Sequence, residues 1–222
     1  PYFLSFISSI IGYANKNNHK ILVNIINNED QFQEMEQDFK NRTISGGIFL
    51  GFENGTPLIT KLAEENFKMV LLDQDPNLFK NTNSLIFADI DDEGASFNVV
   101  KYLTEIGHTK IAHIRHTTKR LSSTYRYKGY FRGLQENNAE INLNYVAIGK
   151  GTESGSYHAM QDIINNSKND LPTAVFAGTD LMASYAIKAI QDSGLNVPED
   201  ISVVGYDDTY LAKYSNPSIT SV

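Results

Sequence analysis

The stretch "TAVFAGTDLMASYAIKAIQDSG", residues 173–194, has the pattern of a buried strand followed at once by a helix. The run "TAVFAG" is short and consists of apolar or small residues, as in a strand inside a parallel sheet. Thr179 then stands where a helix N-cap belongs, and Gly194 is a residue type that ends helices. The stretch therefore predicts one strand–helix unit of an α/β fold.

The same alternation of strand and helix continues through the rest of the chain. Other apolar runs that suit buried strands are "KILVNII" (20–26), "GGIFLGF" (46–52), "KMVLLD" (68–73), "LIFAD" (85–89), "KIAHI" (110–114), "YVAI" (145–148) and "ISVVGY" (201–206). A helix pattern fills residues 91–107 and ends on Gly107, with an expected apolar face of Ala95, Val99, Tyr102, Leu103 and Ile106. Such alternation predicts βαβ units, in which helices cover both faces of parallel sheets.

Length and composition narrow the class of protein. The chain has 222 residues, of which 41% are hydrophobic, so it can bury the core of one large domain or of two lobes. It has no cysteine, which excludes disulfides and thiolate chemistry and fits a reducing compartment. With no membrane span or signal peptide evident in the sequence, we expect a cytoplasmic location and no membrane partner.

The charge of the chain argues against a nucleic-acid surface. There are 19 basic and 26 acidic residues, which gives a formal net charge of −7, and the basic residues are scattered along the sequence. A surface that binds nucleic acid needs a basic stripe or patch. We therefore expect that this chain by itself does not bind DNA.

Polar side chains follow several of the predicted strands directly. In open parallel sheets, ligands bind outside the carboxyl ends of the strands. The residues at these positions are Asp73, Asp89, Arg115, Thr179, Asp180 and Asp207. Helix capping is an alternative role for Thr179, Asp91 and Asp92. Because no clear helix closely follows Asp73 or Asp207, capping does not explain these two carboxylates, and they are candidates for ligand binding.

Several stretches, in chain order, resemble the effector-binding domain of one family. They are "PYF" at the start, "SGGIFLG" (45–51), "VVKYLTEIGHTKIAHI" (99–114), "RYKGYFRGL" (126–134) and the segment from "LPTAVFAGTD" to "SNPSITSV" (171–222). The family is that of the lactose and galactose repressors (LacI/GalR), which are bacterial transcription regulators. The resemblance covers nearly the whole chain. It implies a two-lobed, type I periplasmic-binding-protein-like fold, in which each lobe is a parallel sheet flanked by helices and the ligand lies between the lobes.

The resemblance also implies how the domain is organised. We expect an N-terminal lobe at residues 1–88 and a C-terminal lobe at residues 89–222. By this comparison a DNA-binding helix-turn-helix, a hinge helix and the first strand would precede Pro1. The last helix and strand would follow Val222. Operator DNA would then be bound through a domain absent from this chain.

The ligand-binding residues implied by the resemblance are Tyr2, Phe3, Asp73, Arg120, Ser122, Arg126, Thr179 and Asp207. Tyr2 and Phe3 match an aromatic pair that packs against the ligand ring in related repressors, although a core role for Phe3 is equally open. Arg126, three residues before Gly129, matches the ligand-binding arginine of the family. Asp73 and Asp207 match carboxylates at strand ends that contact the effector.

Other positions match the family pattern less closely. Arg120 and Ser122 stand where a purine-binding member of the family also has an arginine and a hydroxyl residue. Thr179 replaces an asparagine that is frequent before the aspartate of "TDLMA", and Gly151 stands where several relatives have tryptophan or phenylalanine. These differences leave the ligand's identity open.

The residue types in this set suit a small polar ligand. A carboxylate accepts paired hydrogen bonds from sugar hydroxyls, an arginine donates to ring and hydroxyl oxygens, and an aromatic face covers the apolar side of a sugar or base. We expect a sugar or sugar derivative, with a purine-like ligand as an alternative. We also expect Arg126 and Asp207 to be solvated when no ligand is bound, so that replacing either one costs little stability.

No set of residues in the sequence supports catalysis or a cofactor. "GKGTESG" (149–155) has the spacing GxGxxxG rather than that of a nucleotide-binding loop, and we interpret it as a turn. His108, His113 and His116 fit packing and capping better than metal binding. The sequence has no GxSxG or HExxH motif. We therefore predict that the chain is not an enzyme and uses no metal or cofactor.

The function predicted from the sequence is that of a cytoplasmic sensor of a transcription regulator, in which a bound ligand controls DNA binding. The alternative is an extracytoplasmic sugar-binding receptor of a transporter, which has the same fold. The two differ upstream of Pro1, where a helix-turn-helix or a signal peptide would stand. The apolar run "FLSFISSIIGYA" (3–14) has more hydrophobic residues than one inward face needs, so we also expect a homodimer.

Overall fold

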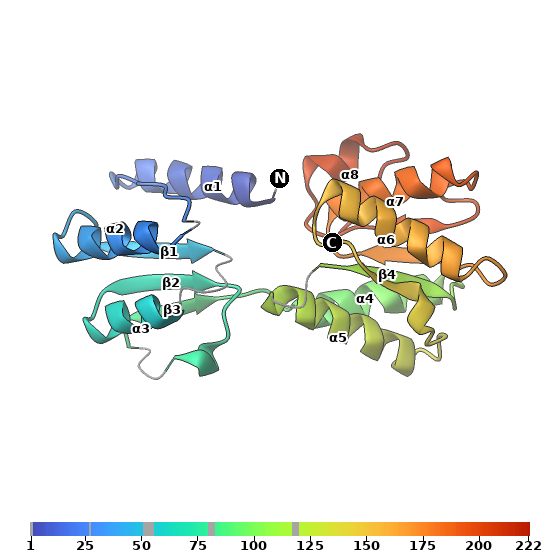
Figure 1. Ribbon diagram of the computed structural model, residues 1–222, viewed down its shortest axis with the longest axis horizontal. Helices are drawn as coiled ribbons and strands as arrows, with labels where there is room; N and C mark the ends of the chain where they lie inside the picture. Colours follow the sequence, from blue (N-terminus) through green and yellow to red (C-terminus); the bar gives the residue numbers. More distant parts are fainter. Residues whose placement is uncertain (1, 27, 51–55, 80–82, 117–119) are drawn as a thin grey trace. The chain divides into compact units, whose positions relative to one another are not determined.

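The computed structural model describes residues 2–26, 28–50, 56–79, 83–116 and 120–222. It consists of two compact units, one made of Ile10–Ile90 and the other of Pro1–Ser9 together with Asp91–Val222. Each unit has its own sheet and its own core (Figure 1). The expected boundary between lobes at residue 88 stays a prediction.

The unit of residues 10–90 contains a three-stranded parallel sheet in the order β1-β2-β3. Helix α1 (Tyr2–Lys16) precedes this sheet in the chain. The elements that follow are α2 (Glu29–Lys40), β1 (Gly46–Leu50), α3 (Thr56–Glu64), β2 (Lys68–Leu72), the 3-10 turn η1 (Pro76–Leu78) and β3 (Leu85–Ala88). Phe39 of α2 and Leu62 of α3 pack with Met69 and Leu71 of β2 in one buried cluster. The apolar runs at residues 46–52, 68–73 and 85–89 therefore contain the three strands of this sheet.

Residues 20–26, which the sequence predicts as a strand, are not a strand in the structure. Ile21, Leu22, Val23 and Ile25 are exposed. A β-strand is stabilised by hydrogen bonds to a neighbouring strand. Within the described residues no strand pairs with this segment, and the apolar pattern alone does not supply that partner.

The unit that includes residues 91–222 contains a four-stranded sheet in the order β5-β4-β6-β7, with all pairs parallel. Its elements are α4 (Asp92–Glu105), β4 (Ile111–Arg115), α5 (Leu121–Glu136), the 3-10 turn η2 (Leu143–Tyr145), β5 (Val146–Ile148), α6 (Glu153–Asn166), β6 (Ala174–Ala177), α7 (Asp180–Asp192), β7 (Ser202–Val204) and α8 (Tyr210–Tyr214). The predicted α/β fold with parallel sheets flanked by helices is confirmed.

Helices cover both faces of this sheet, as Figure 1 shows for α4 and α5 on one side and α6 and α7 on the other. Because side chains alternate along β4, this strand contributes to one buried cluster on each face of the sheet. Ile111 packs with Tyr130 of α5 and Leu103 of α4, whereas Ile114 packs on the opposite face with residues of α6 and α7. This arrangement leaves the carboxyl ends of the strands as the edge at which loops gather.

Helices α4 and α5 pack closely through small residues. A Cβ atom placed on Gly129 would lie well under 3.0 Å from the backbone oxygen of Glu93, and one on Gly133 would collide with Val100. The buried side of α4 accordingly includes Ser96, Val99, Val100 and Leu103. The predicted face of α4 was partly wrong, because Tyr102 and Ile106 are exposed.

No helix in the described parts of the chain combines the length and the apolar character needed to span a bilayer.

The close packing of α4 against α5 gives a stability test. We expect Gly129→Ala to lower the free energy of unfolding by about 1–3 kcal/mol, because the added methyl group forces the helices apart. Gln135→Ala on the exposed side of the same helix is the control and should change stability by less than about 0.5 kcal/mol. Urea denaturation measures both, and equal stabilities of the two variants would contradict the packing described.

Candidate functional site

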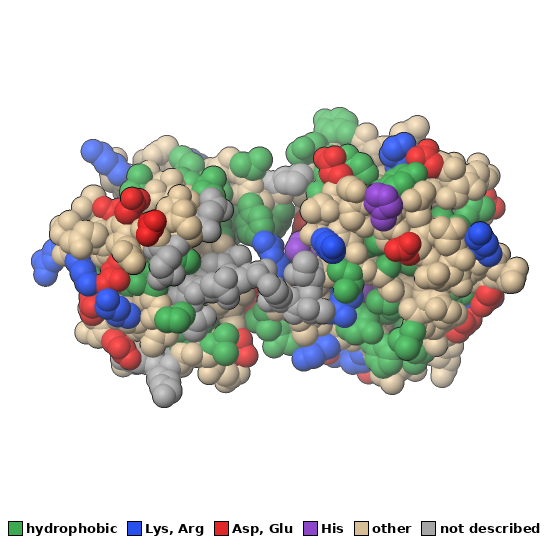
Figure 2. Space-filling model, viewed as in Figure 1, with side chains coloured by type: hydrophobic (Ala, Val, Ile, Leu, Met, Phe, Trp, Pro, Cys, Tyr) green, Lys and Arg blue, Asp and Glu red, His purple; other side chains and the backbone are tan. Residues whose placement is uncertain are grey.

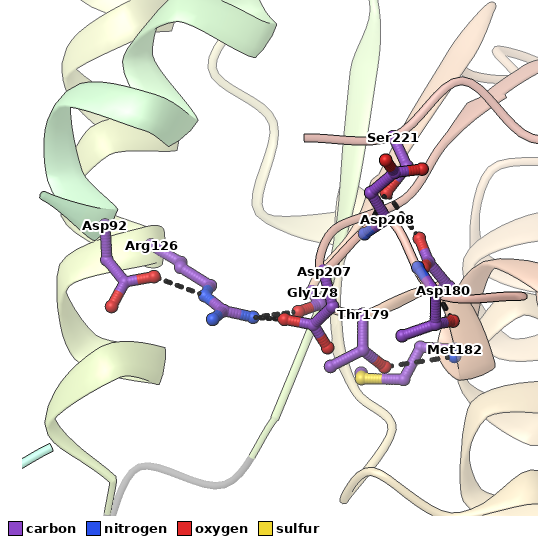
Figure 3. Close-up of polar contacts among 10 residues, drawn as sticks. Asp92, Arg126, Gly178, Thr179, Asp180, Met182, Asp207, Asp208 and Ser221 are labelled. Carbon is purple, nitrogen blue, oxygen red and sulfur yellow. Dashed lines mark hydrogen bonds and ion pairs between the residues drawn. The ribbon is translucent and has the colours of Figure 1, made fainter. Parts of the chain in front are cut away.

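The candidate site lies at the carboxyl edge of the β5-β4-β6-β7 sheet. Parallel strands end at the same edge, so the residues that follow them come together there. His116 follows β4, Gly178 and Thr179 follow β6, and Asp207 comes shortly after β7. Figure 3 shows Arg126 of α5 extending towards this edge, between Asp92 on one side and Gly178 and Asp207 on the other.

Arg126 is the centre of the polar contacts at this edge. Its Nε donates to Asp92 Oδ1 at 2.8 Å, and its Nη1 donates to the carbonyl oxygen of Gly178 at 2.6 Å. The same Nη1 lies 3.5 Å from Asp207 Oδ1. The guanidinium carbon is 3.6 Å from the centroid of the Tyr206 ring, as in a cation–π contact. The Arg126 side chain thus connects its own helix α5 with α4, with the end of β6 and with the turn after β7.

The expectation that Arg126 and Asp207 are solvated without ligand is wrong. The exposed fractions of the side chains are 14% for Arg126, 12% for Asp207 and 3% for Asp92. A buried charge is tolerated only when it is paired and hydrogen-bonded. Arg126 therefore has a structural role in addition to any contact with a ligand.

Burial and neighbouring charges act on the ionisation of this group in opposite directions. Burial lowers the pKa of Arg126, but the carboxylates of Asp92 and Asp207 outweigh it and hold that pKa above its ordinary value. Burial raises the pKa of Asp207 to about 6, Arg126 opposes the increase, and Asp180 and Asp92 add to it. The guanidinium is therefore charged, whereas the carboxyl of Asp207 ionises at a higher pH than an ordinary aspartate.

A second buried carboxylate, Asp180, fixes the turn after β7. It is almost fully buried and accepts hydrogen bonds from the backbone N–H of Thr209 at 2.6 Å, the Thr209 hydroxyl at 2.9 Å and the Ser221 hydroxyl at 2.5 Å. A Cβ on Gly205 would collide with Asp180 Oδ1, so only glycine fits there. The sequence placed Asp180 at a strand end but gave no sign of this role, because its partners are distant in the chain.

The backbone at Asp207 and Asp208 explains why two carboxylates follow a buried strand. Their φ angles are +96° and +42°, in the left-handed region that aspartate tolerates better than most residues. The N–H groups of Gly205 and Asp207 donate to the carbonyl oxygens of Thr220 and Val222, both at 2.8 Å. The sharp turn directs Asp207 towards Arg126 and leaves Asp208 exposed.

Helix starts account for three of the polar residues near strand ends. Thr179 is the N-cap of α7, and its hydroxyl oxygen accepts from the N–H of Met182 at 3.2 Å. Asp91 caps α4 by accepting from Gly94, and Asp92 lies in the first turn. The capping interpretation is therefore confirmed for Thr179 and Asp91, whereas Asp92 is a first-turn acid whose carboxylate accepts from Arg126. The Thr179 hydroxyl still has a proton to donate, so its ligand role stays a prediction.

Arg120 and Phe3 are brought together by the structure. The Arg120 guanidinium lies 5.5 Å from the centroid of the Phe3 ring, and both residues belong to the unit that includes residues 91–222. Ser122 lies in the first turn of α5. Tyr2 stacks on Phe6 with ring centroids 6.2 Å apart. Their contacts with a ligand stay predictions.

Asp73 lies in the other unit, directly after β2, with a φ angle of +58°. Its backbone conformation is the same left-handed one that the turn after β7 uses. The predicted role of Asp73 as a ligand from the first lobe stays a prediction.

The histidine within β4, His113, belongs to the core of its unit. His113 is fully buried beside the rings of Tyr130 and Phe176, and its Nδ1–H donates to the Phe176 carbonyl at 2.8 Å. Burial lowers the pKa of His113 to about 4, so the ring is neutral at physiological pH. Among the described residues no group of three or more potential ligands could hold a metal ion.

One known domain family matches more than half of the chain. A family model described as a periplasmic binding protein-like domain matches residues 100–222. The chain belongs to the periplasmic binding protein-like domain family.

Relatives of this periplasmic binding protein-like domain are transcription regulators. The HTH-type transcriptional repressor PurR of Histophilus somni (strain 129Pt) is 31% identical over 100% of this chain and 66% of its own length. Catabolite control protein A of Priestia megaterium is 31% identical over 89% of this chain and 59% of its own length. The resemblance to LacI/GalR effector-binding domains is thereby confirmed. Both relatives are regulators rather than enzymes, which agrees with the prediction that the chain is not an enzyme.

Solved structures share the fold of this periplasmic binding protein-like domain. The transcriptional regulator CelR in complex with cellobiose has a TM-score of 0.88 and 24% identity, over 100% of this chain and 66% of that one. A LacI regulator from Bacillus cereus subsp. cytotoxis NVH 391-98 has a TM-score of 0.85 and 23% identity, over 100% and 77%. The chain spans at most about two thirds of the two curated relatives described above.

The buried pair of Arg126 and Asp92 gives a test of the structural role. We expect Arg126→Met to lower the free energy of unfolding by roughly 3 kcal/mol, because Asp92 is left buried without its cation. Adding Asp92→Asn should recover part of that loss. Denaturation of the two single variants and the double variant measures the coupling. Strictly additive effects would show that the pair does not hold α4 to α5.

The raised pKa of Asp207 gives a test by pH. In the folded state this carboxyl binds its proton more tightly than in the unfolded state, so its contribution to stability is fully present below about pH 4. It is lost as the pH rises towards about 6. Asp207→Asn removes this titration. The variant should therefore gain roughly 2 kcal/mol of stability relative to the unchanged protein between pH 4 and pH 7.5.

The control is Asp208→Asn, at the exposed neighbour with a similar left-handed backbone. This variant removes a carboxylate from the same turn that is exposed rather than buried against Arg126. Denaturation curves at several pH values check both variants, and a flat difference for Asp207→Asn would contradict the burial of that carboxyl.

Proposed function

We propose that this chain binds a small polar ligand, a sugar or sugar derivative, at the carboxyl edge of the β5-β4-β6-β7 sheet. The observation that carries the proposal is the fixed pair of Arg126 and Asp207 at the strand ends, 3.5 Å apart. Strand ends of this kind are where α/β sheets bind ligands. A purine-like ligand is the alternative that the same groups allow.

The contacts of Arg126 support binding in a prearranged geometry. Asp92, Gly178 and Asp207 engage its Nε and Nη1, so Nη2 has no protein hydrogen-bond acceptor among the described residues. An arginine held in this way donates to a ligand oxygen without losing further side-chain freedom. The Asp207 carboxylate accepts hydrogen bonds from ligand hydroxyls. The pair thus offers both a donor and an acceptor to a hydroxylated ring.

Ligand occupancy would control DNA binding by a segment outside this chain. This part of the proposal is supported by the relative from Histophilus somni, which is named a transcriptional repressor of the helix-turn-helix type. By linkage, a ligand changes DNA affinity only as far as it binds one conformation better than another. The proposal includes a homodimer in the cytoplasm with operator DNA as the second partner.

The charge of the chain supports a proposal in which this chain does not itself contact DNA. Lys and Arg side chains are scattered among acidic ones on the face that Figure 2 shows, and the formal net charge is −7. A DNA-binding surface gathers basic residues. The names of the relatives favour a regulator over a transport receptor.

Binding can be tested directly. Thermal shift with glucose, cellobiose, ribose phosphate, adenine and guanine should identify a ligand, since one that binds only the folded state at 100 times its Kd adds about 2.7 kcal/mol of stability. Asp207→Asn should then weaken binding about tenfold in calorimetry, because a charged hydrogen-bond acceptor is lost.

Asp208→Asn is the matched control and should keep the affinity of the unchanged protein. Equal affinity of both variants and the unchanged protein would remove Asp207 from the ligand site. Failure of every compound in the set to bind would count against a sugar or purine ligand.

A further inference from the structure

Arg115, the last residue of β4, has a charge that no described group of the protein neutralises. Its Nε is buried and has no hydrogen-bond partner, and Arg115 forms no ion pair among the described residues. The carboxylates of Asp92 and Asp207 pair with Arg126 instead. The guanidinium carbon of Arg115 lies 4.1 Å from the centroid of the Tyr127 ring, which is a cation–π contact without a countercharge. A partly buried cation without an anion is costly, so a bound anion would stabilise this position.

A second polar group without a partner, the Ser123 hydroxyl, lies in the first turn of α5. Ser123 is only 5% exposed, and its Oγ forms no hydrogen bond within the described parts of the chain. Arg120, at the N-cap position, gives this turn no side-chain hydrogen bond, and the turn contains no acidic residue. The N-terminus of a helix carries partial positive charge, which an anion stabilises. The start of α5 therefore has the same electrostatic requirement as Arg115.

The packing of α5 on β4 places Arg115 and Ser123 at the same end of the sheet. The Tyr130 hydroxyl donates to the carbonyl oxygen of Ile111 at 2.8 Å, and the Tyr127 ring lies against the Arg115 guanidinium. Each step towards the start of α5 therefore leads towards the carboxyl end of β4. Ser123 precedes Tyr127 by one helical turn on the same side of the helix, so it comes next along this line. Both groups without partners thus stand at the carboxyl edge.

This edge is also the one that carries the proposed ligand site. The carbonyl oxygen of Gly178, after β6, accepts from Arg126 Nη1, and a Cβ placed on Gly178 would lie 3.8 Å from the Cα of Arg115. Strands β4 and β6 are neighbours in the sheet, and neighbouring strands lie roughly 4.8 Å apart. A substituent on a ligand held by Arg126 therefore has to cross about one strand spacing to meet Arg115.

We propose that Arg115 and Ser123 bind a phosphate group of the ligand, which makes the ligand class a phosphorylated sugar; the inference rests on the proposed function. The Arg115 guanidinium donates to the phosphate oxygens, and the Ser123 hydroxyl and the start of α5 stabilise the remaining charge. A buried water would satisfy the hydrogen-bond donors but would leave the cation without an anion. A phosphate group meets both requirements.

The test combines matched compounds with matched variants. Calorimetry measures the affinities for glucose, glucose phosphate, ribose, ribose phosphate and inorganic phosphate, and thermal unfolding without ligand measures stability. Arg115→Met removes the unpaired charge. Its control is Arg132→Met, because Arg132 also lies over a ring, 4.7 Å from the Phe97 centroid, but pairs with a carboxylate. Ser123→Ala removes the hydroxyl, and its control is Ser96→Ala, which removes another buried hydroxyl without a partner, on α4.

We expect one phosphorylated sugar to bind at least about tenfold more tightly than the same sugar without phosphate. Arg115→Met should abolish this preference and change the affinity for the plain sugar by less than about twofold. Ser123→Ala should reduce the preference, Arg115→Lys should restore part of it, and both control variants should keep it. A purely structural Arg115 would lower the melting temperature on substitution without changing the preference, and that result would overturn the inference.

The outcomes separate this inference from the proposed function. If a sugar or purine binds and Asp207→Asn weakens that binding, but phosphate adds no affinity or Arg115→Met keeps the preference, the ligand site stands and the phosphate inference is overturned. Binding of inorganic phosphate alone, with no sugar phosphate bound, also overturns it, because the anion site then belongs to no ligand. If neither the sugars and sugar phosphates nor the purines bind, the proposed function falls and the inference falls with it.

Discussion

The buried guanidinium of Arg126 is the constraint on which the arrangement of residues 91–222 depends. A cation taken out of water is stable only where its partners surround it in fixed positions. Here those partners come from the start of α4, the end of β6 and the turn after β7. None of these elements can shift without leaving a buried charge unpaired. The same contacts that stabilise the fold therefore also hold the candidate site in its geometry.

This dual role determines which groups the proposed ligand would meet. Asp207 is paired with Arg126, and burial already makes its charge costly. A ligand hydroxyl that donates to this carboxylate offsets part of that cost. The buried residue Asp180 keeps the turn in place from behind. Under the proposed function, binding would take place on a framework that is arranged before the ligand arrives, which limits the entropy lost on association.

Much of the fold could be predicted from the sequence, because the information is local. Short apolar runs indicated the strands of both sheets, and Thr179 and Gly194 marked the ends of α7. What depends on distant partners could not be predicted. Residues 20–26 have a strand-like pattern but no paired strand among the described residues. The burial of Arg126 with Asp92, 34 residues apart, also leaves no local sign.

The segment at residues 220–222 holds the turn after β7 in its conformation. Hydrogen bonds connect it to the turn after β7 at Gly205, Asp207 and Asp208, and Ser221 also reaches Asp180. Without these acceptors, the N–H groups of Gly205 and Asp207 would lose their partners and the turn that carries Asp207 would be free to change its conformation. The distance between Asp207 and Arg126 therefore depends on residues that lie 13 or more positions further along the chain.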